Sequence, residues 1–437
     1  MTRFETRPAD WLPAAEALRR ILARAEPLEA ESVPVRDCLG RALARAVHAR
    51  VTLPPWHNSA MDGYAVQCSD LTGASRRNPA ILRVVGEIRA GEGPGPEVSP
   101  GTAVRIMTGA PIPRGADSVV RVEDTDAEAS PGEIRVCSHT EKGRHIRLRG
   151  EDVREGDLVL PAGATLTAEQ MGLLWAAGAE RVMAHRLPRV GILANGDELA
   201  GPGDFHRVLA GEAIPETNSP TLAAAVTLAG GVPVPLGIAR DAPGSIFGKV
   251  ELALAESVDV LVTSGGASMG ERDLFKRVLE EIGFQLDFWR VKMRPGTPFS
   301  FGHLPAGPSR PPIPVFGLPG NPASSFVTFQ VLCRPFLRRL GGHGSVHRPA
   351  VAARAGEAME SPPGITHFLR VILRDRPGSR EAFLAGPQGS GLVRSQAMSH
   401  GLAVIPEETI RIPPGGEVKV MLLDDFCSGG DEAGCLP

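Results

Sequence analysis

Residues 258–268 read VDVLVTSGGAS, a short apolar run that ends in a series of small residues. A buried strand followed by a glycine-rich turn is typical of a parallel sheet that is covered by helices on both faces. Similar strand-like runs occur at 189–193, 232–236, 258–263 and 313–316, and helical patterns lie near 219–229, 244–256, 272–282 and 322–340. This alternation predicts a doubly wound α/β domain over residues 183–341.

The chain on either side of this domain has a different pattern. Between residues 51 and 160, short β-rich runs are broken by Gly and Pro, at 81–88, 103–107, 118–123, 133–136 and 157–160. A β-rich domain is therefore predicted over residues 51–153. Further strand-like runs follow the Gly-Gly-His-Gly linker that begins at residue 341, at 366–373, 381–384, 402–405 and 417–423. These runs predict a small β domain over residues 342–437.

Two helices are predicted outside the α/β domain. Apolar residues recur at helical spacing over residues 10–25, with Asp10 as the N-cap. The sequence Thr167-Ala-Glu-Gln170 has the pattern of a capping box, which predicts a helix through residue 177.

Composition excludes several classes of protein. At about 150 residues per domain, 437 residues suggest about three domains. The chain has 47 Lys and Arg against 50 Asp and Glu, so it has no excess of positive charge to attract nucleic acid or an anionic membrane. Aromatic residues make up only 5%, which disfavours a protein that binds nucleic acid by stacking on its bases. The six cysteines are scattered without a C-x-x-C pair, and the N-terminus lacks a signal peptide's apolar core. We expect a cytoplasmic protein.

Polar and small residues follow all four predicted strands of the α/β domain. In an open parallel sheet, ligands bind outside the carboxyl ends of the strands. Glycine-rich turns at residues 265–268 and 317–322 offer free backbone N–H groups at helix N-termini, which suit a phosphate. The carboxylates Asp197, Glu198, Asp241 and Asp273 would repel that phosphate unless a hard cation lay between them. The combination indicates Mg²⁺ and a phosphorylated ligand, although each loop alone could be an ordinary connector or cap.

Two further groups of residues could carry function. Arg290, Lys292 and Arg294 alternate along a strand-like run, so they would share a face and either bind an anion or protect an edge strand. Polar, glycine-punctuated turns at residues 58–64 and 147–152 accompany Met-Thr-Gly-Ala-Pro from residue 107. Taken singly, each of these turns is more typical of a loop than of a site.

Seven strings in register resemble one family. They are PPWHNSAMDGYAV, AVRIMTGAPIPRGADSVV, IRLRGEDV, GDELAGPG, TSGGASMGERD, FGLPGNPASS and PQGSGLVRS. The family is that of the molybdopterin molybdenumtransferases, the MoeA proteins and the equivalent domain of gephyrin. The resemblance implies a multidomain α/β plus β fold. Its parts are a discontinuous helical and linker domain (1–50 with 154–182), a β-rich lid domain, an α/β domain like that of molybdopterin adenylyltransferases, and a C-terminal β-barrel.

The resemblance also implies a reaction and an assembly. Molybdenum from molybdate is inserted into adenylylated molybdopterin, with Mg²⁺-dependent release of AMP. The β domain of one protomer of a homodimer closes over the α/β domain of the other, and molybdopterin adenylyltransferase and cofactor-accepting enzymes are possible partners.

Site residues follow by motif correspondence. The implied catalytic residues are Asp62, Thr108, Glu198, Asp241 and Asp273. The implied substrate and nucleotide residues are Arg147, Asp152, Gly265, Gly266, Ser268, Gly320, Asn321 and Pro322. The implied oxyanion residues are Lys292, Arg294 and Ser395, and the implied metal ligands are Asp197, Glu198, Asp241 and Asp273.

The chain departs from the family pattern in places. Many members have two lysines in a Lys-Pro-Gly-Lys-Pro string, whereas this chain has Arg294 and Thr297 there, and Ala194-Asn195 replaces the usual Ser-Thr. Two alternative functions stay open at this point. One is adenylyl transfer to molybdopterin, and the other is a non-catalytic dimeric scaffold of the same fold.

Overall fold

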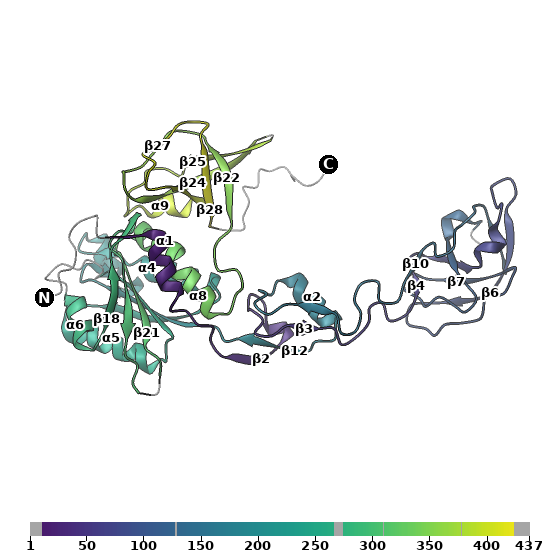
Figure 1. Ribbon diagram of the computed structural model, residues 1–437, viewed down its shortest axis with the longest axis horizontal. Helices are drawn as coiled ribbons and strands as arrows, with labels where there is room; N and C mark the ends of the chain where they lie inside the picture. The colour runs from purple at the N-terminus through teal and green to yellow at the C-terminus, as the bar shows by residue number, and fades with distance from the viewer. Residues whose placement is uncertain (1–10, 127–128, 266–273, 309, 377, 424–437) are drawn as a thin grey trace.

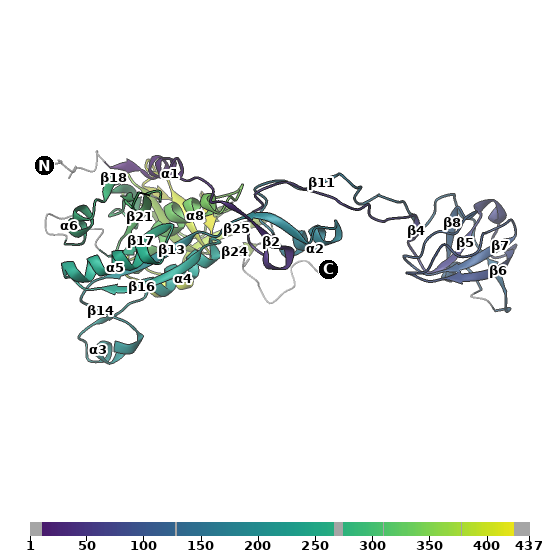
Figure 2. The same ribbon diagram turned by 90° about the horizontal axis from the view of Figure 1, so that it is seen from below.

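The computed structural model describes residues 11–126, 129–265, 274–308, 310–376 and 378–423, and it is elongated (Figure 1). An α/β domain and a C-terminal barrel lie at one end, a small middle domain follows, and a β domain occupies the other end (Figures 1 and 2). No helix in these ranges is long and apolar enough to cross a membrane.

The α/β domain is built on a six-stranded sheet. The strand order is β16 (Val232–Ala239), β13 (Arg189–Asn195), β17 (Val260–Ser264), β21 (Ile313–Leu318), β20 (Ser300–Leu304) and β18 (Gln285–Trp289). The first four strands are parallel, as predicted, whereas β20 pairs antiparallel with β21 and β18 pairs antiparallel with β20. The sequence analysis missed these two strands because Asp287 and His303 interrupt their apolar patterns.

Helices cover both faces of this sheet, as the doubly wound pattern predicts. They are α1 (Ala14–Leu22), α4 (Asn218–Leu228), α5 (Pro243–Ala255), α6 (Leu274–Glu281), α7 (Pro322–Thr328) and α8 (Arg334–Leu340), with a π-helical turn at Phe329–Cys333. Along β17, Val260 and Val262 pack in a core with α1, α4, α7 and α8. The intervening Leu261 packs in a second core with α5 and α6.

The C-terminal region forms a closed five-stranded barrel, which confirms that prediction. The order is β24 (Thr366–Arg376), β25 (Ser379–Leu384), β22 (Ala350–Ala355), β28 (Glu417–Leu422) and β26 (Gly401–Ile405), and β26 pairs back to β24. Strand β19 (Val291–Arg294) leaves the α/β domain and pairs in parallel with β24, so that Arg294 lies opposite His367. This ladder joins the barrel to the α/β domain.

The middle domain is made from two separated stretches of chain. Strand β2 (Ala30–Pro34) pairs with β12 (Arg181–His185), and β3 (Val47–His48) pairs with β11 (Leu158–Leu160). The strand-like run at 157–160 therefore lies here and not in the β domain. Helix α2 (Ala168–Ala176) begins at the predicted capping box, where the backbone N–H of Thr167 donates to Gln170 Oε1 at 3.1 Å.

The β domain contains a five-stranded sheet. Its order is β8 (Ser118–Arg121), β5 (Gly63–Val66), β7 (Thr102–Ile106), β6 (Ala80–Ile88) and β9 (Glu133–Val136), and β4 (Asn58–Ser59) pairs separately with β10 (Ile146–Arg147). The chain enters and leaves this domain through one residue pair. The N–H of Leu53 donates to the carbonyl of Val153 at 2.7 Å, and the N–H of Val153 donates back at 3.2 Å.

The N-terminal helix is shorter than predicted. Helix α1 begins at Ala14, and Leu12–Pro13 form strand β1, which pairs with β19. The ring of Pro13 disfavours helical dihedral angles at Leu12, so the helix cannot begin earlier. Asp10, the predicted N-cap, lies outside the described residues.

Candidate functional site at the carboxyl edge of the sheet

The carboxyl ends of β13, β16, β17 and β21 meet around a cavity of about 480 Å³. Several predicted residues line it, namely Glu198, Asp241, Gly265, Gly320, Asn321 and Pro322. Gly266, Ser268 and Asp273, which were also predicted here, lie outside the described residues. The structure therefore brings together residues from three of the predicted motifs.

Two predicted acids lie against each other at this edge. The N–H of Asp241 donates to Asp197 Oδ1 at 3.2 Å, and the N–H of Asp197 donates to Asp241 Oδ2 at 3.4 Å. Asn195 Nδ2 donates to Asp241 Oδ1 at 3.1 Å, which leaves the buried Oδ1 of Asn195 without a hydrogen-bond partner. Carboxylate and amide oxygens are the donors that Mg²⁺ prefers, so the donor chemistry fits this ion. The described residues do not gather three or more acidic, His or Cys side chains in one metal-binding group.

Asn218, which the sequence analysis missed, ties two of the loops together. It is the first residue of α4, and its Nδ2 donates to Ser264 Oγ at 2.6 Å and to the carbonyl of Gly320 at 2.7 Å. Both donor sites of this buried amide nitrogen are therefore used, as is usual for buried polar groups. The sequence gives no signal for it, because Asn is a common residue at a helix start.

Gly265 is required by its backbone. Its φ is +90°, and an added Cβ would lie 2.5 Å from the carbonyl oxygen of Asn195. The first glycine of the loop therefore lets the β17 and β13 strand ends approach closely beside the cavity.

A group of cationic and hydroxyl side chains lies where the α/β domain meets the barrel. Lys292 and Arg294 lie two apart on β19, and Ser395 is buried in the short helix α9 (Val393–Ala397). Burial and the neighbouring Arg294 and Arg370 lower the pKa of His367 to about 4. Arg294 lies opposite His367 in the β19–β24 ladder, and Arg370 lies three residues further along β24.

Arg370 was missed by the sequence analysis. It is 1% exposed, and its Nη2 donates to the carbonyl oxygens of Pro387 and Gly389 at 3.0 Å. Its Nε and Nη1 are buried without a hydrogen-bond partner, which is costly unless a ligand accepts these bonds. A signal was available, because Arg370 is the single charged residue within the apolar stretch FLRVIL at 368–373.

The loop that follows this arginine touches the cavity. The N–H of Ala323 at the start of α7 donates to the carbonyl of Ser390 at 2.9 Å. The loop after β21 and the loop around Pro387–Gly391 therefore lie in contact. The cationic group adjoins the wall of the carboxyl-edge cavity, which Asn321 and Pro322 line.

Arg290 does not join Lys292 and Arg294, so the predicted shared face of three cations is wrong. Strand β19 begins at Val291, and Arg290 has a φ of +65°. Its guanidinium carbon lies 4.1 Å from the ring centre of Trp289 and 5.2 Å from that of Trp11. The cation–π contacts hold this side chain against the aromatic rings instead.

The predicted residues of the β domain lie far from the cavity. Asp62 Oδ1 accepts hydrogen bonds from the N–H and the Oγ1 of Thr108, at 2.7 and 2.8 Å, and these bonds lower the pKa of the Asp62 carboxyl. Arg147 and Asp152 are exposed on the same domain. Within one chain, this group and the carboxyl-edge cavity lie at opposite ends of the molecule (Figure 2).

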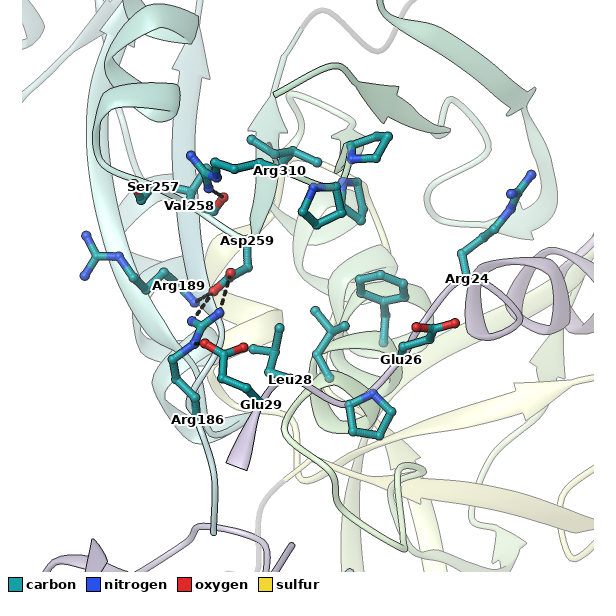
Figure 3. Close-up of a pocket in the computed structure, with 17 residues that line it drawn as sticks. Arg24, Glu26, Leu28, Glu29, Arg186, Arg189, Ser257, Val258, Asp259 and Arg310 are labelled. Atoms are coloured by element: carbon teal, nitrogen blue, oxygen red, sulfur yellow. Dashed lines mark hydrogen bonds and ion pairs between the residues drawn. The ribbon is translucent and has the colours of Figure 1, made fainter. Parts of the chain in front are cut away.

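A larger cavity, of about 650 Å³, lies at the opposite, amino edge of the sheet (Figure 3). None of the predicted residues lines it. Arg186 binds Asp259 through two hydrogen bonds of 2.7 and 2.8 Å, and Arg310 donates to the carbonyl oxygens of Leu254 and Val258. These guanidinium groups are already used by the protein, so the carboxyl-edge cavity is the better candidate site.

Family models match three consecutive parts of the chain. They are described as MoeA N-terminal region (domain I and II), probable molybdopterin binding domain, and MoeA C-terminal region (domain IV), and they match residues 12–178, 191–339 and 352–423.

Similar proteins extend over nearly the whole chain. Molybdopterin molybdenumtransferase 2 of Mycobacterium tuberculosis is 37% identical over 394 residues, which cover 89% of this chain and 94% of that protein. Molybdopterin molybdenumtransferase of Nostoc sp. is 34% identical over 398 residues, which cover 90% of this chain and 89% of that protein. A crystal structure of the molybdopterin biosynthesis protein MoeA from Pyrococcus horikoshii matches with a TM-score of 0.79 and 28% identity, covering 94% of this chain and 100% of that one. Since sequence and fold agree along the same span, the chain belongs to the MoeA family.

Proposed function

We propose that this chain is a molybdopterin molybdenumtransferase of molybdenum cofactor biosynthesis. Molybdenum from molybdate would be inserted into adenylylated molybdopterin, and the phosphoanhydride would be cleaved with loss of AMP. The observation that carries the proposal is the contact between two sites. One is the carboxyl-edge cavity, whose loops suit a phosphate, and the other is the neighbouring cationic group of Lys292, Arg294 and Arg370.

The cavity suits the nucleotide end of such a substrate. Gly320 and Asn321 precede α7, where Pro322 has no N–H and the N–H of Ala323 already donates to the carbonyl of Ser390. The positive end of the helix dipole, rather than a set of free N–H groups, therefore favours an anion at this end of the cavity. Gly265 allows a ligand to approach the neighbouring strand end because it has no side chain. The roles of Gly266 and Ser268 in the same loop stay predictions from the motif.

The cationic group suits molybdate. Arg294 and Arg370 supply guanidinium N–H groups, and Ser395 supplies a hydroxyl close to the loop that Arg370 holds. Guanidinium groups bind tetrahedral oxyanions through paired N–H groups, whereas Lys292 would act as a compact charge. The unused Nε and Nη1 of Arg370 are the donors best explained by a bound oxyanion.

We further propose that Mg²⁺ binds at Asp197 and Asp241, with Glu198 and Asp273 as the remaining predicted ligands. The ion would neutralise the phosphate charge and polarise the bond to the leaving AMP. The protein residues themselves hold the two acids close through their reciprocal backbone hydrogen bonds.

The remaining predicted residues, Asp62, Thr108, Arg147 and Asp152, would complete the site from a second protomer. They lie on the far domain of the same chain, so a homodimer is the simplest way to bring them to the cavity (Figure 2). The hydrogen bonds from Thr108 favour the ionised form of Asp62, which suits a role as a charged ligand for a cation more than a role as a general base.

The test measures AMP release from adenylylated molybdopterin with purified protein. We expect release only when molybdate and Mg²⁺ are both present, and Asp241→Asn should reduce it. Release that does not depend on molybdate would contradict metal insertion, and formation of adenylylated molybdopterin from ATP would instead favour the adenylyltransferase alternative.

Chain mixing tests the shared site. An Asp62→Asn chain mixed equally with an Asp241→Asn chain should recover about a quarter of wild-type activity, because half the dimers are mixed and each has one intact site of two. Mixing Asp62→Asn with Thr108→Ala is the matched control, since both changes lie in the same half of the site. No recovery in the first mixture, with mixed dimers demonstrated, would refute the two-chain site.

A further inference from the structure

A small arm projects from the α/β domain beside the cavity (Figure 2). The arm comprises residues 199–216, in which β14 (Leu199–Ala200) pairs with β15 (Ile214–Pro215) and the short helix α3 (Phe205–Leu209) forms the tip. Leu199, Ile214 and Glu216 at its base line the cavity. Arg240 anchors the base, because its Nη1 donates to the carbonyl oxygens of Asp197 and Leu199 at 3.1 Å.

The arm exposes apolar side chains that its own chain does not cover. Phe205 is 50% exposed, Leu209 79% and Ile214 54%. Acidic residues accompany them, since the arm has Asp204, Glu212 and Glu216 against one arginine. A cluster of exposed apolar residues with charges around it is typical of a surface that binds another protein.

A complementary surface lies on the β domain. Residues 142–149, KGRHIRLR, contain four Lys and Arg and no acid, and within the described residues none of these cations forms an ion pair. We name this segment the basic loop. Two large apolar side chains are exposed here, Leu148 in the basic loop (54% exposed) and Trp56 on the adjoining segment (47% exposed). Arg149 links the two segments, because its N–H donates to His57 Nδ1 and its Nε donates to the carbonyl of Pro55.

We propose that the arm of one chain docks onto the basic loop of a second chain and so holds the second chain's β domain over the carboxyl-edge cavity. This inference rests on the two-chain site proposed above. The two surfaces match in charge and in exposed apolar side chains, which is the complementarity that steers and orients protein partners. They cannot meet within one chain, because they lie at opposite ends of it (Figure 2).

The first test is a zero-length cross-link. Lys142 is the only lysine of the β domain, so a carbodiimide can join its amine to a carboxylate of the arm only if the two are in contact. With equal amounts of isotopically labelled and unlabelled protein, we expect peptides that join Lys142 of one chain to Asp204 or Glu212 of the other. The absence of such mixed peptides in a dimeric sample would overturn the proposal.

The second test uses the apolar contacts. Leu209→Asp on the arm and Leu148→Asp on the basic loop should each raise the half-saturating concentration of adenylylated molybdopterin about tenfold, as expected for residues central to an interface. Leu228→Asp and Ile81→Asp are the matched controls, because these side chains are 68% and 58% exposed at other places on the same two domains. They should leave this concentration unchanged.

The outcomes separate the two proposals. If the Asp62→Asn and Asp241→Asn mixture recovers activity while Leu209→Asp cross-links and saturates like the wild type, the two-chain site stands and the arm contact is refuted. If that mixture does not recover activity, the shared site itself fails. Reduced cross-linking in Leu209→Asp and Leu148→Asp, together with normal behaviour of both controls, supports the arm contact.

Discussion

Replacement of Gly265 by alanine tests how closely the two strand ends must approach. An alanine at φ +90° is strained by roughly 1–2 kcal/mol. Its Cβ would also lie 2.5 Å from the carbonyl oxygen of Asn195, and no rotation of a side chain can relieve a contact with backbone. The loop must therefore shift, which weakens the 3.2 Å hydrogen bond from the N–H of Gly265 to the carbonyl of Leu318, at a cost of about 1 kcal/mol.

The expected net change follows from these contributions. Alanine restricts the unfolded chain more than glycine does, which returns about 0.4–1 kcal/mol. We therefore expect Gly265→Ala to lower the free energy of unfolding by about 2 kcal/mol. The same shift disturbs the cavity wall, so the half-saturating concentration of adenylylated molybdopterin should rise.

Urea unfolding followed by tryptophan fluorescence measures the stability of this domain once Trp56 and Trp175, which lie in the other domains, are replaced by phenylalanine. The remaining Trp11 and Trp289 both contact Arg290 beside the sheet. Two control variants separate the causes. Gly211 has a φ of +76° and open space around it, so Gly211→Ala should show only the backbone strain. Gly248 lies within α5 with open space, so Gly248→Ala should stabilise the protein by about 0.5–1 kcal/mol. A Gly265→Ala protein no less stable than Gly211→Ala would refute the argument from close approach.

Three further changes have defined outcomes. Burial and nearby cations lower the pKa of His343 to about 3 from its usual 6.5. The unfolded chain therefore takes up the proton first, and the free energy of unfolding should fall as the pH is lowered from 6.5 towards 3. His343→Gln should flatten this pH dependence in urea titrations, and an unchanged pH dependence would exclude this histidine as the cause. Arg370→Met should raise the molybdate concentration for half-maximal AMP release at least about tenfold. It also removes the hydrogen bonds from Nη2 to the carbonyls of Pro387 and Gly389, and the loss of two unpartnered buried N–H groups offsets that cost only in part, so saturation is compared in folded protein. Normal molybdate saturation would remove Arg370 from the oxyanion pocket. Thr297→Lys introduces the second lysine of the family pattern, so it should lower the molybdate concentration for half-maximal AMP release. The same concentration in the variant and the wild type would show that position 297 does not face the oxyanion.

The sequence predicted the strands whose residues are nearly all buried, because such strands are apolar along their whole length. Strand β17 is buried on both faces, so its apolar run was unambiguous, and the capping box at Thr167 marked α2 because both of its hydrogen bonds are local. Strands β18 and β20 were missed because they form the antiparallel edge of the sheet, where alternating polar residues are tolerated.

The site was predictable where motifs follow strands and was not where domains meet. Asp197 and Asp241 were expected at one edge because parallel strands end together. Asn218 acts through contacts with loops distant in sequence, and such contacts leave no pattern in its own neighbourhood. Arg370 did leave a signal, as the single charged residue of an apolar stretch, but that signal does not say which loop the side chain contacts. The three-cation face failed at Arg290, where a turn rather than a strand sets the direction of the side chain.

The paired hydrogen bonds between Leu53 and Val153 make the β domain a cassette with a single point of attachment. Both ends of the insertion meet at one residue pair, so a two-residue Asn-Gly turn could close the chain in place of residues 54–152. The shortened protein would keep the cavity, the barrel and the cationic group. Chimaeras that receive this cassette from different relatives would then vary the covering half of the site while the remainder of the protein stayed constant.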